Sequence, residues 1–413
     1  MKIIADLHIH SPYARACSPM LTLPNIDIWC QKKGIDVVAV GDFTHPQRYW
    51  EMKELLVEKA SGLYQLKNNS QNTYFIMSTE VAAIYSHLGK VRRLHLCLFL
   101  SSLEKVQIFN QALEKRGAKL KSDGRPILGM SAKDILKILK DVDPDGFMVP
   151  AHAWTPWFAV FGSKSGYNSL AECFEEMTPE IKAIETGLSS DPLMNWRVSA
   201  LDHINLISNS DAHSLANLGR EANIFALDEL SYAEIKTAIN DKSANKLVQT
   251  IEFYPEEGMY HYDGHRACNV SFAPAETKKR KGICPICGRQ LTLGVAYRVD
   301  ELADRSEKDI HRLGNFVSIV PLQEILADVY QVGKGAKKII NLYDQLVQRG
   351  GNEFNILLNL SKEQIIKISN VQIAEAIIKM RNKEIDIQPG FDGQYGRIKI
   401  AINSEKRQQI SLI

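Results

Sequence analysis

The 413-residue sequence predicts an α/β protein with three parts: a β/α barrel over residues 1–250, a zinc-binding domain over 251–320 and a mainly helical domain over 321–413. Three observations predict this organisation. Short apolar runs alternate with amphipathic stretches in the first part. A Cys-x-x-Cys pair occurs in the second part, and long amphipathic stretches fill the third. A chain of this length also exceeds one average domain.

Composition narrows the class of protein. A hydrophobic content of 45% and a charged content of 24% are typical of a globular protein with a sizeable core. We expect a cytoplasmic protein without a membrane partner, because no apolar stretch is long enough to span a membrane and no cleavable signal pattern opens the chain. Residues 1–277 carry 28 Lys+Arg and 33 Asp+Glu, whereas residues 278–413 carry 22 and 15. The acidic first part favours cations, and the basic second part favours a polyanion.

The expected strands and helices of the first part follow from apolar periodicity. The apolar runs are Val37–Val40, Tyr74–Met77, Leu94–Leu100, Gly146–Val149, Ala183–Ile184, Leu206–Ile207 and Ile224–Leu227. Amphipathic stretches between them are Leu103–Arg116, Ala132–Lys140 and Glu229–Asn240. The sequence contains no dinucleotide-binding fingerprint and no phosphate-binding Gly-Lys-Ser/Thr loop, so it does not indicate a nucleotide-binding fold.

Residues that bind metals follow most of these runs. Directly behind Ile3–Ala5, the side chains of Asp6, His8 and His10 share one face of an extended chain, and two imidazoles favour zinc, manganese or iron over magnesium alone. The later candidates are Asp42, His45, Glu80, His95, His152, Glu185, Asp211 and His213. Because the carboxyl ends of barrel strands meet at one mouth, this recurrence predicts a multinuclear metal site.

Two short pairs predict a structural zinc site in the second part. Cys284-Pro-Ile-Cys287 is a zinc knuckle, and His265-x-x-Cys268 supplies the other two ligands, with His261 or His311 as alternatives. A basic run that contains Lys278, Lys279 and Arg280 lies between the two pairs. Such a run is often a solvated loop, but beside a zinc site it also suits contact with phosphates.

Helices are expected over Leu322–Gln331, Ala336–Arg349 and Lys362–Met380. Gly333 and Gly335 separate the first two, as in a helix-hairpin-helix turn whose backbone amides hold a DNA phosphate, although a packing turn would look the same. A turn at Pro389–Gly393 and a strand at Arg397–Ile402 follow.

With these residues assembled, the first 230 residues resemble the polymerase and histidinol phosphatase (PHP) family of metal-dependent phosphoesterases. Over nearly the full length the chain is similar to one branch of it, the endonuclease Q family. The stretches that carry this resemblance are Gly41-Asp42-Phe43-Thr44-His45-Pro46, Ala151-His152-Ala153-Trp154-Thr155-Pro156-Trp157-Phe158, Ser208-Asn209-Ser210-Asp211-Ala212-His213, the two zinc pairs and Pro389-Gly390-Phe391-Asp392-Gly393. The resemblance implies a distorted β/α barrel and a DNA repair endonuclease, which cuts 5′ of uracil, hypoxanthine, xanthine or an abasic site.

The expected active site follows from these motifs. Two or three divalent ions (Zn, Mn or Mg) are expected at the barrel mouth, and one structural zinc in the second domain. We expect the ligands to be His8, His10, His45, Glu80, His95, His152, Asp211 and His213, with Asp6 and Asp42 as ligands or as residues that orient them. Asp211, His213 and His152 are the expected catalytic residues. Ala16 stands where many members of the family have a further histidine, which leaves the number of ions open.

Damaged DNA is the expected partner, and no protein partner is predicted. A damaged base must leave the duplex to be read, and Trp154, Trp157 and Phe158 follow His152 where they would line a pocket for it, unless they pack in the core. Asn195-Trp196-Arg197 is a second candidate for this pocket. Competing interpretations are a small-molecule phosphatase such as one acting on histidinol phosphate, a proofreading exonuclease, and a DNA-binding protein without activity.

Overall fold

The computed structural model describes residues 1–68, 73–310 and 312–400. An eight-stranded sheet holds the first strand near its middle, in the order β16-β13-β12-β1-β2-β5-β4-β3. Its strands are β1 (Lys2–Asp6), β2 (Val37–Ala39), β3 (Leu56–Ala60), β4 (Leu63–Leu66), β5 (Tyr74–Ile76), β12 (Ala222–Ala226), β13 (Leu247–Phe253) and β16 (Phe316–Ile319). β1 pairs in parallel with β2 and antiparallel with β12, so residues about 220 positions apart lie side by side.

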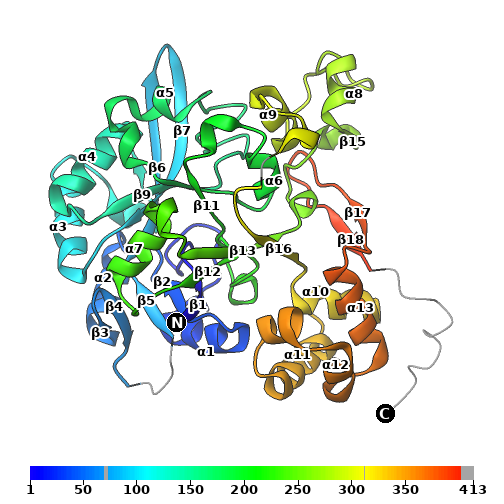
Figure 1. The fold of residues 1–413 in the computed structure, drawn as a ribbon. Helices are drawn as coiled ribbons and strands as arrows, with labels where there is room; N and C mark the ends of the chain where they lie inside the picture. The colour runs from blue at the N-terminus through cyan, green and yellow to red at the C-terminus, as the bar shows by residue number, and fades with distance from the viewer. Residues whose placement is uncertain (69–72, 311, 401–413) are drawn as a thin grey trace.

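Two smaller sheets complete the first part (Figure 1). A four-stranded sheet has the order β8-β6-β7-β9, and β10 pairs in parallel with β11. These strands are β6 (Ser78–His87), β7 (Lys90–Phe99), β8 (Ile127–Leu128), β9 (Phe147–Pro150), β10 (Ala183–Glu185) and β11 (Asn205–Ile207). The prediction of a mixed α/β fold is therefore confirmed.

Helices connect and cover these strands. They are α1 (Leu23–Lys33), α2 (Pro46–Leu55), α3 (Leu103–Glu114), α4 (Ala132–Val142), α5 (Leu170–Phe174), α6 (Pro192–Asn195) and α7 (Tyr232–Asn240). α4 illustrates why they form: the Ser131 hydroxyl accepts the Asp134 N–H at the first turn, and Ile135 and Leu139 repeat on the buried face. Among the residues described, no helix is long and apolar enough to cross a membrane.

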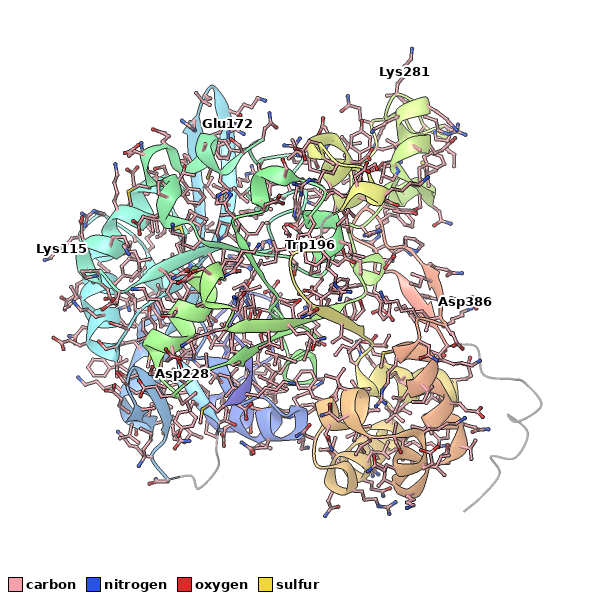
Figure 2. The ribbon with its side chains drawn as sticks, viewed as in Figure 1. Lys115, Glu172, Trp196, Asp228, Lys281 and Asp386 are labelled. Carbon is pink, nitrogen blue, oxygen red and sulfur yellow. The ribbon has the colours of Figure 1, made fainter. Side chains whose placement is uncertain are left out.

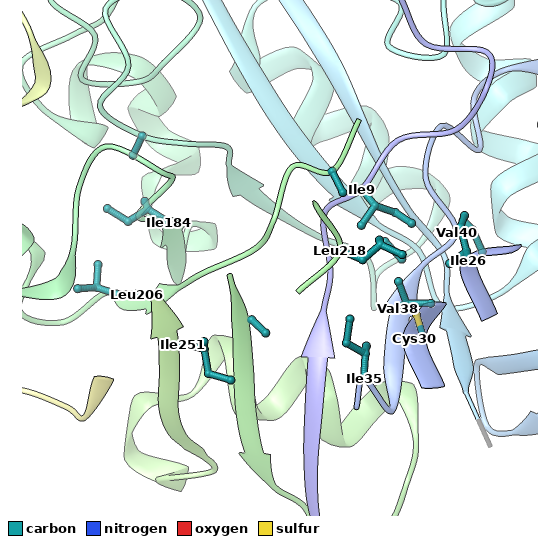
Figure 3. Close-up of a cluster of buried hydrophobic side chains, with 14 of the residues drawn as sticks. Ile9, Ile26, Cys30, Ile35, Val38, Val40, Ile184, Leu206, Leu218 and Ile251 are labelled. Carbon is teal, nitrogen blue, oxygen red and sulfur yellow. The ribbon is translucent and has the colours of Figure 1, made fainter. Parts of the chain in front are cut away.

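The main core lies beneath the strand ends that carry the predicted ligands. Its residues form one cluster, in which Figure 3 shows Ile9, Val38 and Ile26 of α1 on one side and Ile184 and Ile251 on the other. All five side chains are buried. Because these strands share one packed interior, the loops that follow them are held close together.

The remaining chain lies to one side of the first part (Figure 1). The segment predicted to bind zinc, called the zinc-binding segment below, contains β14 (Asp263–His265), β15 (Val270–Phe272), α8 (Pro274–Lys279) and α9 (Val295–Leu302). Figure 2 shows Lys281 at its outer end. The helical segment contains α10 (Leu322–Tyr330), α11 (Lys337–Gly350), a π-helix (Asn355–Asn359), α12 (Lys362–Ile368) and α13 (Val371–Arg381). The hairpin β17 (Asp386–Gln388) and β18 (Arg397–Lys399) lies between the two segments in this view.

The structure changes several expected boundaries. The domain boundary predicted at residue 250 falls inside β13, and β16 returns to pair with that strand. The single helix expected over Lys362–Met380 breaks where the Asn370 side chain accepts the Ile373 N–H and starts α13. The β3–β4 hairpin was not predicted, and residues 401 and 402 of the expected last strand lie outside the described residues.

Candidate metal centre

The first two histidines of the centre are each held by a carboxylate. His8 Nδ1 lies 3.0 Å from both oxygens of Glu185, and His10 Nδ1 lies 3.0 Å from Asp42 Oδ1. Because each Nδ1–H donates to a carboxylate, the opposite Nε2 lone pair is free to face a shared space. The sequence left Asp42 either as a metal ligand or as a residue that orients a ligand. Its contact with His10 Nδ1 is that of an orienting residue.

Glu80 of β6 lies between two groups of ligand atoms. Its Oε2 is 3.4 Å from His10 Nε2 and 3.7 Å from His8 Nε2. Its Oε1 is 2.8 Å from His95 Nδ1 and 3.1 Å from His152 Nε2. One carboxylate thus presents a different oxygen to each group, so Glu80 would be able to hold a cation in each.

Asp211 completes the first group from the loop after β11. Its Oδ1 lies 3.0 Å from His10 Nε2 and 3.7 Å from His8 Nε2, and its backbone adopts a left-handed φ of 46°. Asp6 fixes this loop, because its two oxygens accept the N–H groups of Ser210 and Gly219 at 3.0 and 2.9 Å. Burial raises the pKa of Asp6 to about 6. Asp6 is thus a residue that orients the loop and does not lie among the ligand atoms.

The residues present fit divalent metal ions. Ligand atoms within 4.8 Å of one another form two groups that share Glu80: His8, His10, Glu80 and Asp211, and Glu80, His95 and His152. His8 Nε2 is buried without a hydrogen-bond partner, a position that costs free energy unless a cation fills the space before it. Imidazole nitrogens with carboxylate oxygens suit zinc, manganese or iron.

Charge in the centre favours the ionised form of Glu80. Burial alone would raise the pKa of this carboxyl, but nearby positive charge, including that of the Arg125 guanidinium, outweighs burial and holds the pKa well below its usual range. Burial lowers the pKa of His95 to about 4, which keeps this imidazole neutral and able to bind a metal.

The other two predicted histidine ligands lie at the edge of these groups. The His213 ring is 4.5 Å from the His10 ring, and His213 Nδ1 is 2.8 Å from the backbone oxygen of Asp211. His45 stacks on Tyr13 at 4.6 Å, and its Nδ1 is buried without a partner. Neither histidine belongs to the two groups of ligand atoms found among the described residues.

The sequence did not predict the roles of two residues of the centre, Glu185 and Arg125. Glu185 closes β10, a strand-end position that signalled it, but its bond to His8 was not anticipated. Arg125 donates from Nη1 to Glu80 Oε2 at 2.9 Å. No local pattern marked Arg125, because it lies in a loop between α3 and the two-residue strand β8.

Of the aromatic residues that follow His152, one packs in the core and another lies beside the candidate metal centre. Trp154 is 1% exposed, and its indole N–H donates to Asn195 at 2.7 Å, so the predicted DNA contact of Trp154 is corrected to core packing. Phe158 instead lies 4.5 Å from the His95 ring, with a left-handed φ of 62°. Trp157 is partly exposed and contacts Tyr260 edge-on at 5.8 Å.

The second aromatic candidate is also a packing element. Trp196, labelled in the interior in Figure 2, is buried and contacts Phe316. The neighbouring Arg197 is paired with Asp300 at 2.7 Å. The segment Asn195-Trp196-Arg197 therefore packs within the first part and joins it to α9 through the Arg197–Asp300 pair.

The predicted zinc residues lie together in the second segment. The ligand atoms of His265, Cys268, Cys284 and Cys287 are all within 4.8 Å of one another. Desolvation would raise the pKa of Cys284, but hydrogen bonds from the backbone N–H groups of Cys287 and Ile286 bring it to about 6, which favours the thiolate that zinc needs. His261 is engaged elsewhere, 3.1 Å from the Ser189 backbone oxygen. His311 lies outside the described residues.

The basic run of the zinc-binding segment is only partly available to a ligand. Lys278 is paired with Asp300, and Arg280 with Glu276 at 2.7 Å. Lys279 is largely exposed, 3.9 Å from Glu276. Of the three predicted phosphate contacts in this run, Lys279 is thus the least engaged with the protein.

The predicted glycine turn borders a large cavity. Gly333 and Gly335 lie in the exposed turn between α10 and α11. A cavity of about 880 Å³ reaches from Gly333 and Lys334 to Arg220 and the β18 strand, and a second of about 400 Å³ includes Gly335 and Ser214. Ser214 directly follows His213, so the two cavities lead from the glycine turn toward the metal centre.

Comparisons with known proteins agree with this geometry. Over its whole length the chain superposes on the lesion-specific endonuclease PfuEndoQ from Pyrococcus furiosus, with a TM-score of 0.84 and 30% identity over 100% of both chains. The chain belongs to the endonuclease Q family. This result confirms the family resemblance predicted from the sequence. An endonuclease Q structure in complex with a 27-mer duplex substrate, with an abasic lesion at the active site, matches with a TM-score of 0.86 and 30% identity over 100% of this chain and 99% of that one.

Two sequence comparisons extend the endonuclease Q match. An uncharacterized Bacillus subtilis protein, YqxK, is 29% identical over 412 residues, which are 96% of this chain and 99% of YqxK. Residues 321–384 match the family model of the MJ0043 C-terminal domain. That match covers the helical segment from α10 to α13.

Proposed function

We propose that this chain is a DNA repair endonuclease that hydrolyses the phosphodiester on the 5′ side of a deaminated base or an abasic site. The observation that carries the proposal is the match over the whole chain to an endonuclease Q with an abasic lesion at its active site. The buried groups of imidazoles and carboxylates on the same fold supply the means for metal-dependent hydrolysis. We expect the P–O3′ bond to break, so that the nick carries a 3′-hydroxyl and a 5′-phosphate.

Two divalent ions fit the groups of ligand atoms best. One is bound by His8, His10, Glu80 and Asp211, and the other by Glu80, His95 and His152. His45 and His213 border these positions, and a third ion would need them together with a further ligand. Zinc or manganese suits the imidazole-rich set, and magnesium alone does not.

The ions supply charge neutralisation at the phosphate and an acidified water as nucleophile. The protein's own residues hold the arrangement in place. Asp42 and Glu185 fix the rings of His10 and His8, and Asp6 fixes the loop of Asp211. Thr155 lies 3.1 Å from His152 Nδ1, so the Nε2 of His152 faces Glu80. Because these contacts are buried, the ligands need little rearrangement when a substrate binds.

The DNA lies between the metal centre and the two later segments in this proposal. Arg220, Lys334, Arg397 and Lys399 line the larger cavity, where they suit a phosphate backbone. The N–H groups of the Gly333–Gly335 turn and the ammonium of Lys279 add contacts at either end. Phe158, with Trp157 beyond it, lies beside His95 where a flipped nucleotide would stack.

The domain organisation is part of the proposal. The three sheets of the first part form the distorted barrel of PHP proteins, which explains why ligands from β1, β6, β7, β9 and β11 meet. The barrel includes β13 and β16, which moves its boundary past residue 250. A zinc ion at His265, Cys268, Cys284 and Cys287 organises the next domain, and the helices from α10 onward form the last.

The test uses an internal hypoxanthine or abasic site in a labelled duplex with added Mn²⁺, Mg²⁺ or Zn²⁺. We expect a single nick 5′ of the lesion and no cleavage of the intact duplex. Asp211→Ala should lower the rate on the order of 10²–10³-fold or more, with duplex binding largely retained. Asp228→Ala, at a side chain that is 88% exposed and paired with Lys246 on the surface, is the matched control.

Two results would refute the assignment. Full nicking by Asp211→Ala would separate the activity from this centre. Hydrolysis of a small phosphomonoester without any cleavage of damaged DNA would favour the small-molecule phosphatase, and duplex affinity that does not fall with salt would agree with that outcome.

A further inference from the structure

Arg125 is a cation inside the metal centre for which the proposed reaction has so far assigned no role. Its Nη1 donates to Glu80 Oε2 at 2.9 Å, on the side of Glu80 that faces His8 and His10. The Arg125 side chain is 22% exposed, whereas Glu80 is fully buried. The guanidinium therefore reaches from the solvent-facing mouth of the centre to its shared carboxylate.

The position of Arg125 follows from strand register. β8 runs parallel to β6, with Ile127 opposite Ala82 and Leu128 opposite Ala83. The Pro126 backbone oxygen accepts the Ala82 N–H at 3.0 Å. Continuing this register by two residues places Arg125 level with Glu80, so the pairing of the strands sets the contact between the two side chains.

The loop that carries Arg125 is fixed to the loops that carry the ligands. The Gly124 N–H donates to the Tyr13 backbone oxygen at 2.9 Å, and its carbonyl accepts the Thr44 hydroxyl at 3.2 Å. A Cβ at position 124 would lie 2.6 Å from Asp42 Oδ2, so the backbone approaches as closely as glycine allows. These contacts hold Arg125 rigidly against the loops of His10 and Asp42.

The guanidinium has donors to spare. Arginine carries five N–H groups, and among the side chains that the structure describes Glu80 is the acceptor bonded to this guanidinium. None of its nitrogens is among the buried atoms without a partner, and the side chain is partly exposed at the mouth. Planar, paired N–H groups match the oxygens of a phosphate, and this is the chemistry for which arginine differs from lysine.

We propose that Arg125 binds a non-bridging oxygen of the scissile phosphate while one N–H stays on Glu80, so that the phosphate is positioned over the ligand groups. The proposal rests on the proposed nuclease function and adds a phosphate-binding residue to it. The alternative is that Arg125 only neutralises Glu80. The two roles predict different binding: only direct contact with the phosphate makes Arg125 contribute to the affinity for a phosphate-bearing duplex.

The test compares two nicked product duplexes as competitors of the holoenzyme, one with a 5′-phosphate at the nick and one with a 5′-hydroxyl. The wild type should bind the 5′-phosphate duplex more tightly. In Arg125→Gln this preference should shrink by about ten-fold or more, and Arg125→Lys should restore part of it. Arg15→Gln is the matched control, because Arg15 is 85% exposed and pairs with Asp123 of the same loop.

Metal content and melting temperature of each variant accompany the competition. The proposal requires that Arg125→Gln keeps its metals and its fold while the phosphate preference falls. An unchanged preference in Arg125→Gln overturns it, and so does a loss of bound metal that fully accounts for the change, because Arg125 would then act only through Glu80. Failure of the wild type to nick damaged duplex is a separate result, which overturns the proposed function itself.

Discussion

The metal centre and the zinc-binding segment contain similar ligands but are assembled in opposite ways. In the centre, His8 and Asp211 are about two hundred residues apart in the chain and meet through buried strands. In the zinc-binding segment, all four ligands lie between His265 and Cys287. The apolar cluster beneath them consists of Val270, Cys284 and Leu291.

This difference indicates that the fold positions the ligands of the metal centre, whereas a bound ion is needed to fold the zinc-binding segment. The rings of His8 and His10 are oriented by Glu185 and Asp42 in the protein itself. The zinc-binding segment buries too few apolar side chains to hold its turns without an ion. We therefore expect removal of ligands to abolish activity in the first region and folding in the second.

Cys284→Ser should give the largest effect, because a structural zinc ion contributes on the order of 10 kcal/mol to the folding of such a segment. We expect one zinc ion fewer per chain, rapid proteolysis between residues 261 and 294, and weaker binding of damaged duplex. Metal analysis with limited proteolysis measures this effect. Cys173→Ser, in α5 and outside both regions, should change neither result. A protease-resistant zinc-binding segment in Cys284→Ser would contradict the comparison.

Glu185→Gln should weaken the centre without unfolding it. The amide keeps a hydrogen bond to His8 but loses the charge that makes its imidazole a better ligand, so metal affinity or nicking should fall by about 10–100-fold. Metal titration and single-turnover nicking measure the change. Glu114→Gln, on an exposed end of α3, serves as the control. An unfolded Glu185→Gln would show that the centre, like the zinc-binding segment, depends on its ligands for structure.

The smallest expected effect is a change in the pH dependence of stability, caused by the buried carboxyl of Glu252, which has no imidazole partner. Burial raises the pKa of Glu252 to about 7, and the carboxyls of Glu221 and Asp191 face it. A raised pKa means stability that is present at low pH and is lost as the pH rises from about 4.5 to 7. Glu252→Gln should therefore gain about 2 kcal/mol over the wild type between pH ~5.5 and ~8.5.

Urea unfolding at both pH values measures this gain. The hydroxyls of Thr186, Ser208 and Thr250, which bond to Glu252, can rotate to suit the amide. Glu229→Gln, at an exposed position, should show no such gain. A parallel pH dependence in Glu252→Gln and wild type would mean that Glu252 ionises freely and that the interior behind the centre is hydrated.

Much of the centre is visible in the sequence because several of its residues follow an apolar run. His8, Asp42, His152 and Asp211 occupy strand ends, and strand ends of β/α units meet. The helices predicted over Leu103–Arg116 and Ala132–Lys140, whose apolar residues repeat every three to four positions, are found at Leu103–Glu114 and Ala132–Val142. Local patterns were enough for these elements.

The contacts that join distant segments could not be read locally. Arg125 reaches Glu80 through the register of β8 on β6, and nothing in residues 123–126 indicates that register. Trp154 was expected at the DNA, but Asn195 of α6 accepts its indole N–H in the core. The β3–β4 hairpin was missed because its alternation of apolar and charged residues continues that of α2.

The central place of β1 in its sheet has a consequence for synthesis of the protein. β1 is bonded to β2 on one side and to β12 on the other, and the Leu7 N–H donates to the Asn209 side chain, so this strand lacks its antiparallel partner until residue 226 has left the ribosome. At 5–20 residues per second this delay is roughly 10 to 45 s. During that time the nascent chain contains His8, His10 and Glu80 of the first ligand group but lacks Asp211. The complete pocket forms after the loop of Asp211 has emerged.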